Sequence, residues 1–234
     1  MKPGLELSKV VLLGRTLDEY SRYFSLNVEA LRGKAILDIA SGVSSFCVEG
    51  NAHGLNVTAF DLIYELSPEE IKMRCEPDLE FVLSEIGKVA AYKWDFYKTP
   101  EKLRTFRERA YRLFLPDFLK AKGERYIFGK LPRTPFRDGQ FDLTLISYLL
   151  FVYEEQAGFD YPFHKESLLE ILRITSGEVR IYPLVNFKAE RSRTFEALKS
   201  DPTFADFIFE EVQTDFEFLK NSNAFVRIHR KPGR

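Results

Sequence analysis

The chain has 234 residues, of which 45% are hydrophobic and 29% charged. This length suits one large α/β domain with an insertion, and it excludes two complete folds. Thirty-four basic against 35 acidic residues give a net charge of −1, which argues against a protein that mainly binds nucleic-acid phosphates. Cys47 and Cys75 lack metal or disulfide spacing, and no apolar run suits a signal peptide or membrane span. We expect a soluble, cytoplasmic protein without a metal site.

The N-terminal part of the chain has helical periodicity. Between residues 7 and 31, apolar residues recur at helical spacing, at Leu13, Leu17, Tyr20 and Phe24. Gly14 interrupts this pattern, because glycine lowers helix stability. We therefore expect an N-terminal helical segment within residues 1–33, either as one helix or as two short ones.

Residues 34–64 carry the most informative pattern in the chain. Residues 35–39 are an apolar run typical of a buried strand, and a helix is expected to begin near Ser44 or Ser45. A second strand is expected over residues 56–60, directly before a carboxylate, Asp61. A strand, a tight turn, a helix and a second strand ending on an acid form the layout that binds a nucleoside cofactor.

The turn of this unit and its acid have complementary roles. Small residues let the backbone approach a ligand closely, and here they are Ala40, Ser41, Gly42 and Ser44. Asp61 follows Gly42 by 19 residues, at the carboxyl end of its strand, where it can accept hydrogen bonds from two ribose hydroxyls. Such bonds to a charged acceptor contribute about 1.5–3 kcal/mol each. We interpret this unit as a nucleoside-cofactor site, the alternative being a sheet that has lost its ligand.

Residues 64–123 separate the second predicted strand from the third. The sequence Ser67-Pro68-Glu69-Glu70 combines an N-cap, a proline at the first helical position and a capping box, and Thr99-Pro100 repeats the start. The second helix carries its apolar residues on one side, and Pro116 is expected to end or bend it. We therefore expect a mostly helical insertion over residues 64–123, between the second and third strands.

The alternation of strands and helices resumes after this insertion. Strands are expected over 125–128, 141–147 and 178–185, and helices over 166–174 and 189–208, with a new start at Asp201-Pro202. The chain then reads as two strands joined at residues 221–223. Helices between strands predict a parallel sheet, and a terminal hairpin adds an antiparallel edge.

Four segments, in this order, resemble the motifs of class I, Rossmann-like methyltransferases that use S-adenosylmethionine. The Asp-x-Gly-x-Gly-x-Gly motif corresponds to residues 38–44, the acid after the second strand to Asp61, and a Gly-Asp to Phe-Asp-Leu run to residues 129–147. The closing hairpin resembles the reversed last strand of that fold. The resemblance implies an α/β fold of three layers, with a mostly parallel seven-stranded sheet, an antiparallel C-terminal strand and the helical insertion, all within one methyltransferase domain over residues 1–234.

The chain also departs from the family pattern. Ala40 and Ser44 replace two of the three glycines, so the turn must tolerate a Cβ at both positions. Lys130 stands where the family often has an acid that bonds the adenine amine, and a lysine cannot accept that bond. The Asn/Asp-Pro-Pro-Tyr motif of enzymes that methylate nucleic-acid amines is absent, since Ser147-Tyr148-Leu149-Leu150 follows the fourth strand. This argues against adenine or cytosine amine methylation.

The resemblance implies a role for each candidate residue. Gly42 and its neighbours would contact the methionine part of the cofactor, with Asp38 holding the turn or the amino group, while Asp61 would hold the ribose. Leu62, Gly129 and Lys130 would lie near the adenine. Ser147 and Tyr148 would line the reactive end of the site. Arg15 and Tyr20 would cap the cofactor or bind its carboxylate. For Arg15 and Tyr20 the alternative is an ordinary amphipathic helix, and for Tyr148 it is packing at a strand end.

No catalytic residue is assigned, because methyl transfer needs a general base only if the acceptor must lose a proton. His164 is a conceivable base, although a surface or helix-capping histidine is favoured, and His53 and His229 are given no role.

The insertion is the second functional question. Between residues 88 and 122 there are ten basic and four acidic residues among many aromatic ones, a composition that can bind RNA or an acidic substrate. However, the aromatic residues of 103–118 fall on one helical face, as in core packing, and residues 65–85 are acidic by seven to two. We favour a cap over the mouth of the active site over a nucleic-acid platform.

The favoured function is methyl transfer from S-adenosylmethionine to a small or medium acceptor. Alternatives are a non-catalytic cofactor-binding scaffold, an RNA methyltransferase and a nicotinamide-dependent oxidoreductase. The last matches poorly, because residues 40–45 supply one glycine of the three in its G-x-G-x-x-G fingerprint.

Overall fold

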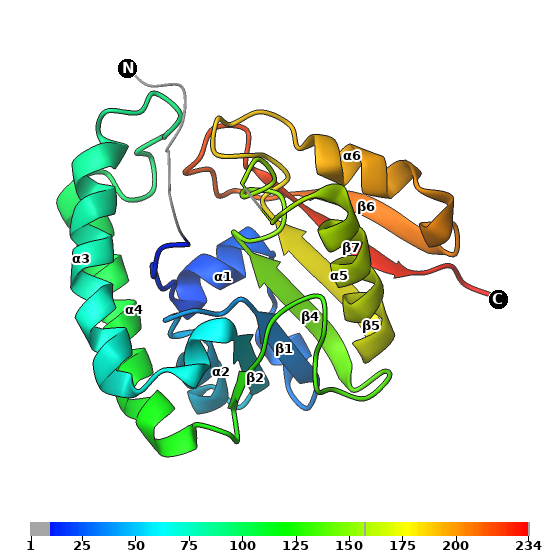
Figure 1. Cartoon of the computed structure of the whole chain (residues 1–234), viewed down its shortest axis with the longest axis horizontal. Helices are drawn as coiled ribbons and strands as arrows, with labels where there is room; N and C mark the ends of the chain where they lie inside the picture. Colours follow the sequence, from blue (N-terminus) through cyan, green and yellow to red (C-terminus); the bar gives the residue numbers. More distant parts are fainter. Residues whose placement is uncertain (1–9, 157, 234) are drawn as a thin grey trace.

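The computed structural model describes residues 10–156 and 158–233. At its centre is a seven-stranded sheet with the strand order β3-β2-β1-β4-β5-β7-β6 (Figure 1). Strands β1 to β5 pair in parallel, whereas β7 is antiparallel to both β5 and β6. This confirms the predicted mostly parallel sheet with an antiparallel C-terminal strand. The strands are β1 (Ala35–Ile39), β2 (Asn56–Asp61), β3 (Tyr126–Phe128), β4 (Phe141–Ser147), β5 (Thr175–Tyr182), β6 (Phe207–Gln213) and β7 (Ala224–Arg230).

Helices cover both faces of the sheet, which gives three layers (Figure 1). Successive side chains of β1 point to opposite faces. Ile36 packs in a cluster with α1 to α4, whereas Leu37 and Ile39 pack in a second cluster with α5 and α6. The helices are α1 (Leu17–Tyr23), α2 (Phe46–Ala52), α3 (Pro68–Ile86), α4 (Pro100–Ala121), α5 (Tyr161–Ile174) and α6 (Arg193–Ser200), with short 3₁₀ turns η1 (Glu29–Leu31), η2 (Leu62–Glu65) and η3 (Pro202–Phe204).

The prediction for the N-terminal segment was wrong over residues 10–16, which form no helix and which we call the N-terminal strap. Gly14 lies against the turn after β1, where an added Cβ would be 2.2 Å from the Val43 carbonyl oxygen. Thr16 then caps α1, and Glu19 completes a capping box. The strap therefore follows tertiary contacts, although its apolar spacing resembles that of a helix. The part of the prediction over residues 7–9 lies outside the described residues.

The insertion consists of α3 and α4, which lie side by side beyond β2 (Figure 1). Both predicted starts are confirmed: the Ser67 side chain accepts from the Glu70 N–H within a capping box, and the Thr99 side chain accepts from the Lys102 N–H. Pro116 does not end α4, which continues to Ala121. Phe114 and Phe118 on either side of the proline are fully buried, and this packing offsets the backbone hydrogen bond that Pro116 cannot donate.

Several boundaries in the second half of the chain differ from the prediction. Helix α5 begins at Tyr161 rather than at residue 166, because the Asp160 side chain caps it by accepting from the Phe163 N–H at 3.0 Å. Strand β5 spans Thr175–Tyr182 and so lies three residues earlier than predicted. The predicted helix over 189–208 is only α6 and η3, and the new start at Asp201 is confirmed by its cap on Thr203. The link between β6 and β7 occupies residues 214–223.

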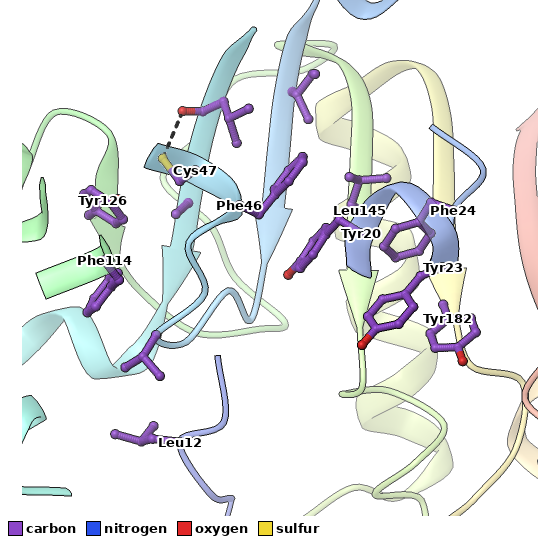
Figure 2. Packing of buried hydrophobic residues seen from close by; sticks show 14 of the residues in the cluster. Leu12, Tyr20, Tyr23, Phe24, Phe46, Cys47, Phe114, Tyr126, Leu145 and Tyr182 are labelled. Atoms are coloured by element: carbon purple, nitrogen blue, oxygen red, sulfur yellow. Dashed lines mark hydrogen bonds between the residues drawn. The ribbon is translucent and has the colours of Figure 1, made fainter. Parts of the chain in front are cut away.

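The core beneath α1 and α2 is rich in aromatic rings (Figure 2). Tyr20 stacks on Phe46 with ring centroids 4.3 Å apart, and Tyr23 stacks on Tyr182 at 4.6 Å. Cys47 is a buried free thiol whose sulfur contacts the Val57 carbonyl at 3.4 Å. This core therefore anchors the strand ends that form the site described next. Among residues 10–156 and 158–233, no helix is long and apolar enough to cross a membrane.

Candidate cofactor and acceptor site

A cavity of about 520 Å³ lies at the carboxyl ends of β1, β2 and β4. Its lining includes Ala40 after β1, Asp61 at the end of β2, and Ser147 at the end of β4. In open parallel sheets, ligands bind outside this edge, and the volume is in the range of small-molecule sites. The cavity therefore lies where the sequence predicts the cofactor.

The turn after β1 forms one side of this cavity. Ala40 and Gly42 both have φ of +57°, in the left-handed region. At Gly42 an added Cβ would meet nothing within 4 Å, so the backbone faces open space. Ala40 keeps its Cβ in a conformation that costs a residue other than glycine about 1–2 kcal/mol. The turn thus tolerates a Cβ at position 40, with strain stored next to the cavity.

Asp61 connects the turn to β2. Its carboxylate accepts from the Gly42 N–H at 2.8 Å through one oxygen and from the Ile63 N–H at 2.9 Å through the other. Burial raises the pKa of Asp61, while its hydrogen bonds to Ile63 and Gly42 oppose that shift. A carboxylate has about four acceptor positions, so Asp61 retains capacity for a ligand after these two bonds. It also lines the cavity.

Asp38 lies behind the turn and is fully buried. Both of its oxygens accept from the Tyr20 hydroxyl, at 2.9 and 3.0 Å, and the Ser147 hydroxyl in turn donates to Tyr20 at 3.1 Å. Burial raises the pKa of Asp38 to about 7, against the opposing effect of its hydrogen bonds. Tyr20 and Asp38 are not among the lining residues, so the structure places them as supports behind the cavity. Of the two roles predicted for Asp38, holding the turn agrees with this position.

Arg15 belongs to the N-terminal strap and lines the cavity. Its backbone N–H donates to the Ser44 hydroxyl at 3.1 Å, which explains why Ser44 supports the turn from behind rather than facing the cavity. The Arg15 guanidinium lies 4.4 Å from the centroid of the Tyr148 ring. Tyr148 has φ of +52°, which turns the chain sharply at the end of β4. Strap and strand end thus meet at the cavity.

Leu62, Gly129 and Lys130 line the opposite side of the cavity, next to β3. Leu62 is 51% exposed, an unusual position for a large apolar side chain. Gly129 cannot be replaced without displacement, because an added Cβ would lie 2.5 Å from the Phe60 ring. The backbone N–H of Gly129 donates to the Asp61 carbonyl at 3.3 Å. This side of the cavity therefore combines the apolar Leu62 side chain, main chain at close range and the exposed side chain of Lys130.

The insertion supplies a third side of the cavity through α3 and α4. Arg107 on α4 is buried and lines the cavity. Its guanidinium donates to Glu19 of α1 at 2.6 Å, to the Gly14 carbonyl at 2.9 Å and to the Tyr97 hydroxyl at 2.7 Å. Burial by itself raises the pKa of Glu19, but the Arg107 charge and the hydrogen bonds of Tyr97 and Thr16 hold it below its ordinary value. This buried ion pair attaches the insertion to the strap and to α1.

The end of the cavity away from Asp61 and Leu62, which we call the aromatic end, is formed by connecting segments and by the first turn of α5. Its rings are packed against one another; for example, the centroids of Tyr153 and Phe187 are 4.9 Å apart, and those of Tyr92 and Phe218 are also 4.9 Å apart. The aromatic residues that line this end are Tyr92, Tyr148, Tyr153, Phe159, Phe163, Phe187 and Phe218.

His164 is neither a surface residue nor a cavity residue. It is fully buried, and its ring nitrogens lie 2.8 Å from the Asp160 carbonyl oxygen and 2.6 Å from that of Leu150. It therefore joins the segment after β4 to the first turn of α5. Asp160 rather than His164 caps α5, so His164 is neither the surface residue nor the helix cap that the sequence favours, and it does not line the cavity where a base would act.

The uncharacterized protein MJ0045 of Methanocaldococcus jannaschii is 40% identical to this chain over 233 residues, which are 97% of this chain and 99% of that protein. The chain belongs to the same family as this archaeal protein. No established sequence-family profile matches the chain.

Solved structures with a similar fold include S-adenosylmethionine-dependent methyltransferases. The magnesium protoporphyrin IX methyltransferase of Synechocystis PCC 6803, solved with its cofactor bound, is 8% identical, with a TM-score of 0.48 over 92% of this chain and 78% of that one. A methyltransferase of Methanosarcina mazei is 13% identical, with a TM-score of 0.44 over 87% and 96% of the two chains. These TM-scores are below 0.5, so the fold assignment rests on the strand order and on the reversed β7, which are those of the Rossmann-like methyltransferases that the sequence resembles.

The structure brings most of the predicted site residues to one cavity. Ten line it, namely Arg15, Ala40, Ser41, Gly42, Asp61, Leu62, Gly129, Lys130, Ser147 and Tyr148, whereas Tyr20, Asp38 and Ser44 lie behind it. The sequence analysis missed the aromatic end and the lining residues of the insertion. Arg107 did carry a signal, because it lies four residues after Leu103 and seven before Phe114, on the apolar face of its helix.

Proposed function

We propose that the protein is an S-adenosylmethionine-dependent methyltransferase that acts on a small or medium acceptor inside the cavity. The observation that carries this proposal is the pair formed by Gly42 and Asp61. An uncrowded left-handed turn and a carboxylate with unused acceptor capacity face the same cavity at the carboxyl edge of the sheet.

The residues present fit the cofactor. Asp61 can accept from ribose hydroxyls with the oxygen lone pairs that Gly42 and Ile63 leave unused. The turn offers backbone to the methionine part, and Leu62 and the Gly129 main chain offer an apolar surface to the adenine. Lys130 cannot accept a bond from the adenine amine. Carbonyl groups near β3 are therefore the acceptors that we expect.

Catalysis in this proposal depends on orientation and on exclusion of water. When bound, the cofactor supplies an activated methyl group: the acceptor forms a bond to the methyl carbon, the carbon–sulfur bond breaks, and its electron pair stays on sulfur. Ser147 and Tyr148 at the end of β4 line the cavity where the reaction would occur. Correct orientation of two reactants can supply about 7–11 kcal/mol of the barrier. The strap and the insertion would exclude water from this place, which is the role of a cap.

The charges of the insertion favour this role over that of an RNA platform. Six of the ten basic residues between 88 and 122 form ion pairs with carboxylates: Lys88, Lys93, Arg104, Arg107, Arg109 and Arg112. Arg104 pairs with Glu80 from the acidic stretch of α3. Binding to a nucleic acid requires cations that can neutralise its phosphates and so release the counterions condensed on it. The pairing therefore lowers the charge available to a nucleic acid.

Calorimetry with S-adenosylmethionine, S-adenosylhomocysteine and NAD tests the proposal. We expect micromolar binding of the first two compounds and none of NAD. The Asp61→Ala variant should bind S-adenosylhomocysteine at least tenfold more weakly, because it loses bonds to a charged acceptor worth about 1.5–3 kcal/mol each. The matched control is Asp138→Ala. The Asp138 carboxylate is 83% exposed and, among the contacts described, pairs only with Arg173. This variant should bind S-adenosylhomocysteine as the wild type does. Binding of NAD alone would replace this proposal with the oxidoreductase.

A further inference from the structure

The aromatic end of the cavity determines the shape of molecule that fits there. Seven aromatic side chains line it, together with the aliphatic residues Val11 and Leu13 of the strap. Packed rings bind flat apolar bodies well, by stacking and by edge contacts. The acceptor expected from this lining has a planar, largely apolar body, unlike a sugar or a polar amino acid.

The charges of the cavity lining are predominantly positive. Arg15, Arg74, Arg107 and Lys130 line it, and Asp61 is the one carboxylate among the described lining residues. Arg107 is neutralised by Glu19 at 2.6 Å, and Arg74 lies 3.9 Å from the carboxylate of Asp78. Lys130 is exposed, at the end near β3. Arg15, by contrast, is partly buried, and within residues 10–156 and 158–233 no carboxylate lies at ion-pair distance from it.

The side chain of Arg15 also has few hydrogen-bond partners. One terminal nitrogen donates to the Leu13 carbonyl at 2.5 Å, but its Nε is buried and has no partner among the described residues. Burial raises the pKa of Tyr92, Tyr148 and Tyr153, and the nearby Arg15 charge opposes this shift at all three. Arg15 thus lies among the rings of the aromatic end. A partly buried guanidinium without an acid is stabilised strongly by an anionic partner.

Among the described residues that line the cavity, none is suited to removing a proton from the acceptor. The described lining residues include no histidine, cysteine or glutamate. Asp61 is engaged by two backbone N–H groups next to the turn. The three lining tyrosines have raised pKa values because they are buried, so they remain protonated near neutral pH. An acceptor that has to lose a proton before it can attack the methyl group must therefore arrive already deprotonated.

We propose, on the basis of the function proposed above, that the acceptor is a planar aromatic or conjugated organic acid whose ionised oxygen is held by Arg15 and receives the methyl group. The acceptor oxygen gains the bond to the methyl carbon, sulfur keeps the electron pair of the broken bond, and the negative charge of the acid cancels the sulfonium charge. No proton moves in this step. The neutral product loses its attraction to Arg15, which favours its release.

Binding of simple probes tests this assignment without requiring the natural acceptor. With saturating S-adenosylhomocysteine, calorimetry would compare benzoate and 2-naphthoate with the corresponding amides and with the corresponding arylmethylamines. We expect at least one acid to bind tenfold more tightly than its amide, and the amines to bind more weakly still. The proposal is overturned if neither acid exceeds its amide or if an amine binds most tightly. Binding of S-adenosylhomocysteine in the same cell keeps the cofactor proposal intact in that case.

Variants of Arg15 separate its two candidate partners. Arg15→Gln should reduce the affinity for the acid at least tenfold and remove its advantage over the amide, while the affinity for S-adenosylhomocysteine changes less than twofold. Arg15→Lys should keep part of the preference for the acid. Arg32→Gln is the control, because Arg32 is exposed and pairs with Glu29 on the surface. A loss of S-adenosylhomocysteine binding in Arg15→Gln, with the preference for the acid intact, would assign Arg15 to the cofactor carboxylate and refute the inference.

Discussion

Replacing Arg107 by methionine removes a buried contact that attaches the insertion to α1 and to the strap. The guanidinium is 5% exposed and the Glu19 carboxylate is fully buried. In Arg107→Met, Glu19 keeps the Thr16 backbone N–H at 2.8 Å and the Tyr97 hydroxyl but loses its only cation among the described residues. Removing one partner of a buried ion pair costs about 3–5 kcal/mol, because the remaining charge is buried without compensation. The Gly14 carbonyl also loses its donor.

Urea denaturation followed by circular dichroism measures this loss as a shift of the unfolding midpoint at constant slope. Arg104→Met is the matched control, since it makes the same substitution three residues away on α4. Arg104 is 36% exposed and its partner Glu80 is 52% exposed, so water already screens that pair. We expect a large shift for Arg107→Met and a small one for Arg104→Met.

A double-mutant cycle with Glu19→Gln makes the reasoning refutable. The double variant Glu19→Gln/Arg107→Met has no buried charge at this position and should recover a large part of the stability that Arg107→Met loses, because uncharged replacements of buried pairs are often tolerated. Equal unfolding midpoints for Arg107→Met and Arg104→Met, or a double variant no more stable than Arg107→Met, would show that the pair does not hold the insertion.

Three further predictions concern the turn and the strap. Because the pKa of Asp38 is raised to about 7, its proton stabilises the fold fully below about pH 4, and this stabilisation is lost as the pH rises through about 7. In urea titrations the free energy of unfolding of the wild type should therefore fall by about 2 kcal/mol between pH 5.5 and pH 8. The Asp38→Asn variant should not show this fall. Ala40→Gly should raise the unfolding free energy by up to about 1 kcal/mol, because glycine relieves the cost of φ +57°; a decrease in the same assay would contradict the strain argument. Gly14→Ala should cost about 1–3 kcal/mol through overlap with the Val43 carbonyl, whereas Gly87→Ala, where a Cβ meets nothing within 4 Å, should leave the thermal midpoint nearly unchanged.

Local signals in the sequence were sufficient for the starts of α3 and α4 and for the succession of strands along the chain. Caps such as Ser67 and Thr99 act within one helical turn, and the apolar run of β1 is visible in five consecutive residues. The errors over the strap and at Pro116 occurred where distant contacts outweigh local preference, whereas the start of α5 was missed although its cap, Asp160, is a local signal. The strap has helical spacing but forms no helix, and its Gly14 lies against Val43. Helix α4 continues through Pro116 because Phe114 and Phe118 are buried beside it.

The cofactor half of the site was predictable from the sequence for a simple reason. Parallel strands place their carboxyl ends at one edge, so Ala40, Asp61 and Ser147 had to meet once the strands were recognised. The buried network behind the turn was less accessible to prediction. Tyr20 was chosen as a cofactor contact, yet its hydroxyl bonds Asp38, a partner 18 residues away that helical periodicity does not indicate.

The amino-acid sequence by itself determined the alternation of elements, the small-residue turn and the acid that closes it, because each depends on neighbours within a few positions or on the regular geometry of a parallel sheet. The tertiary structure alone decided the aromatic end of the cavity, the burial of Arg107 against Glu19, and the position of Arg15 over Tyr148. These features unite the strap, the insertion and the loops after β4 and β5, and no local pattern encodes how such segments pack together.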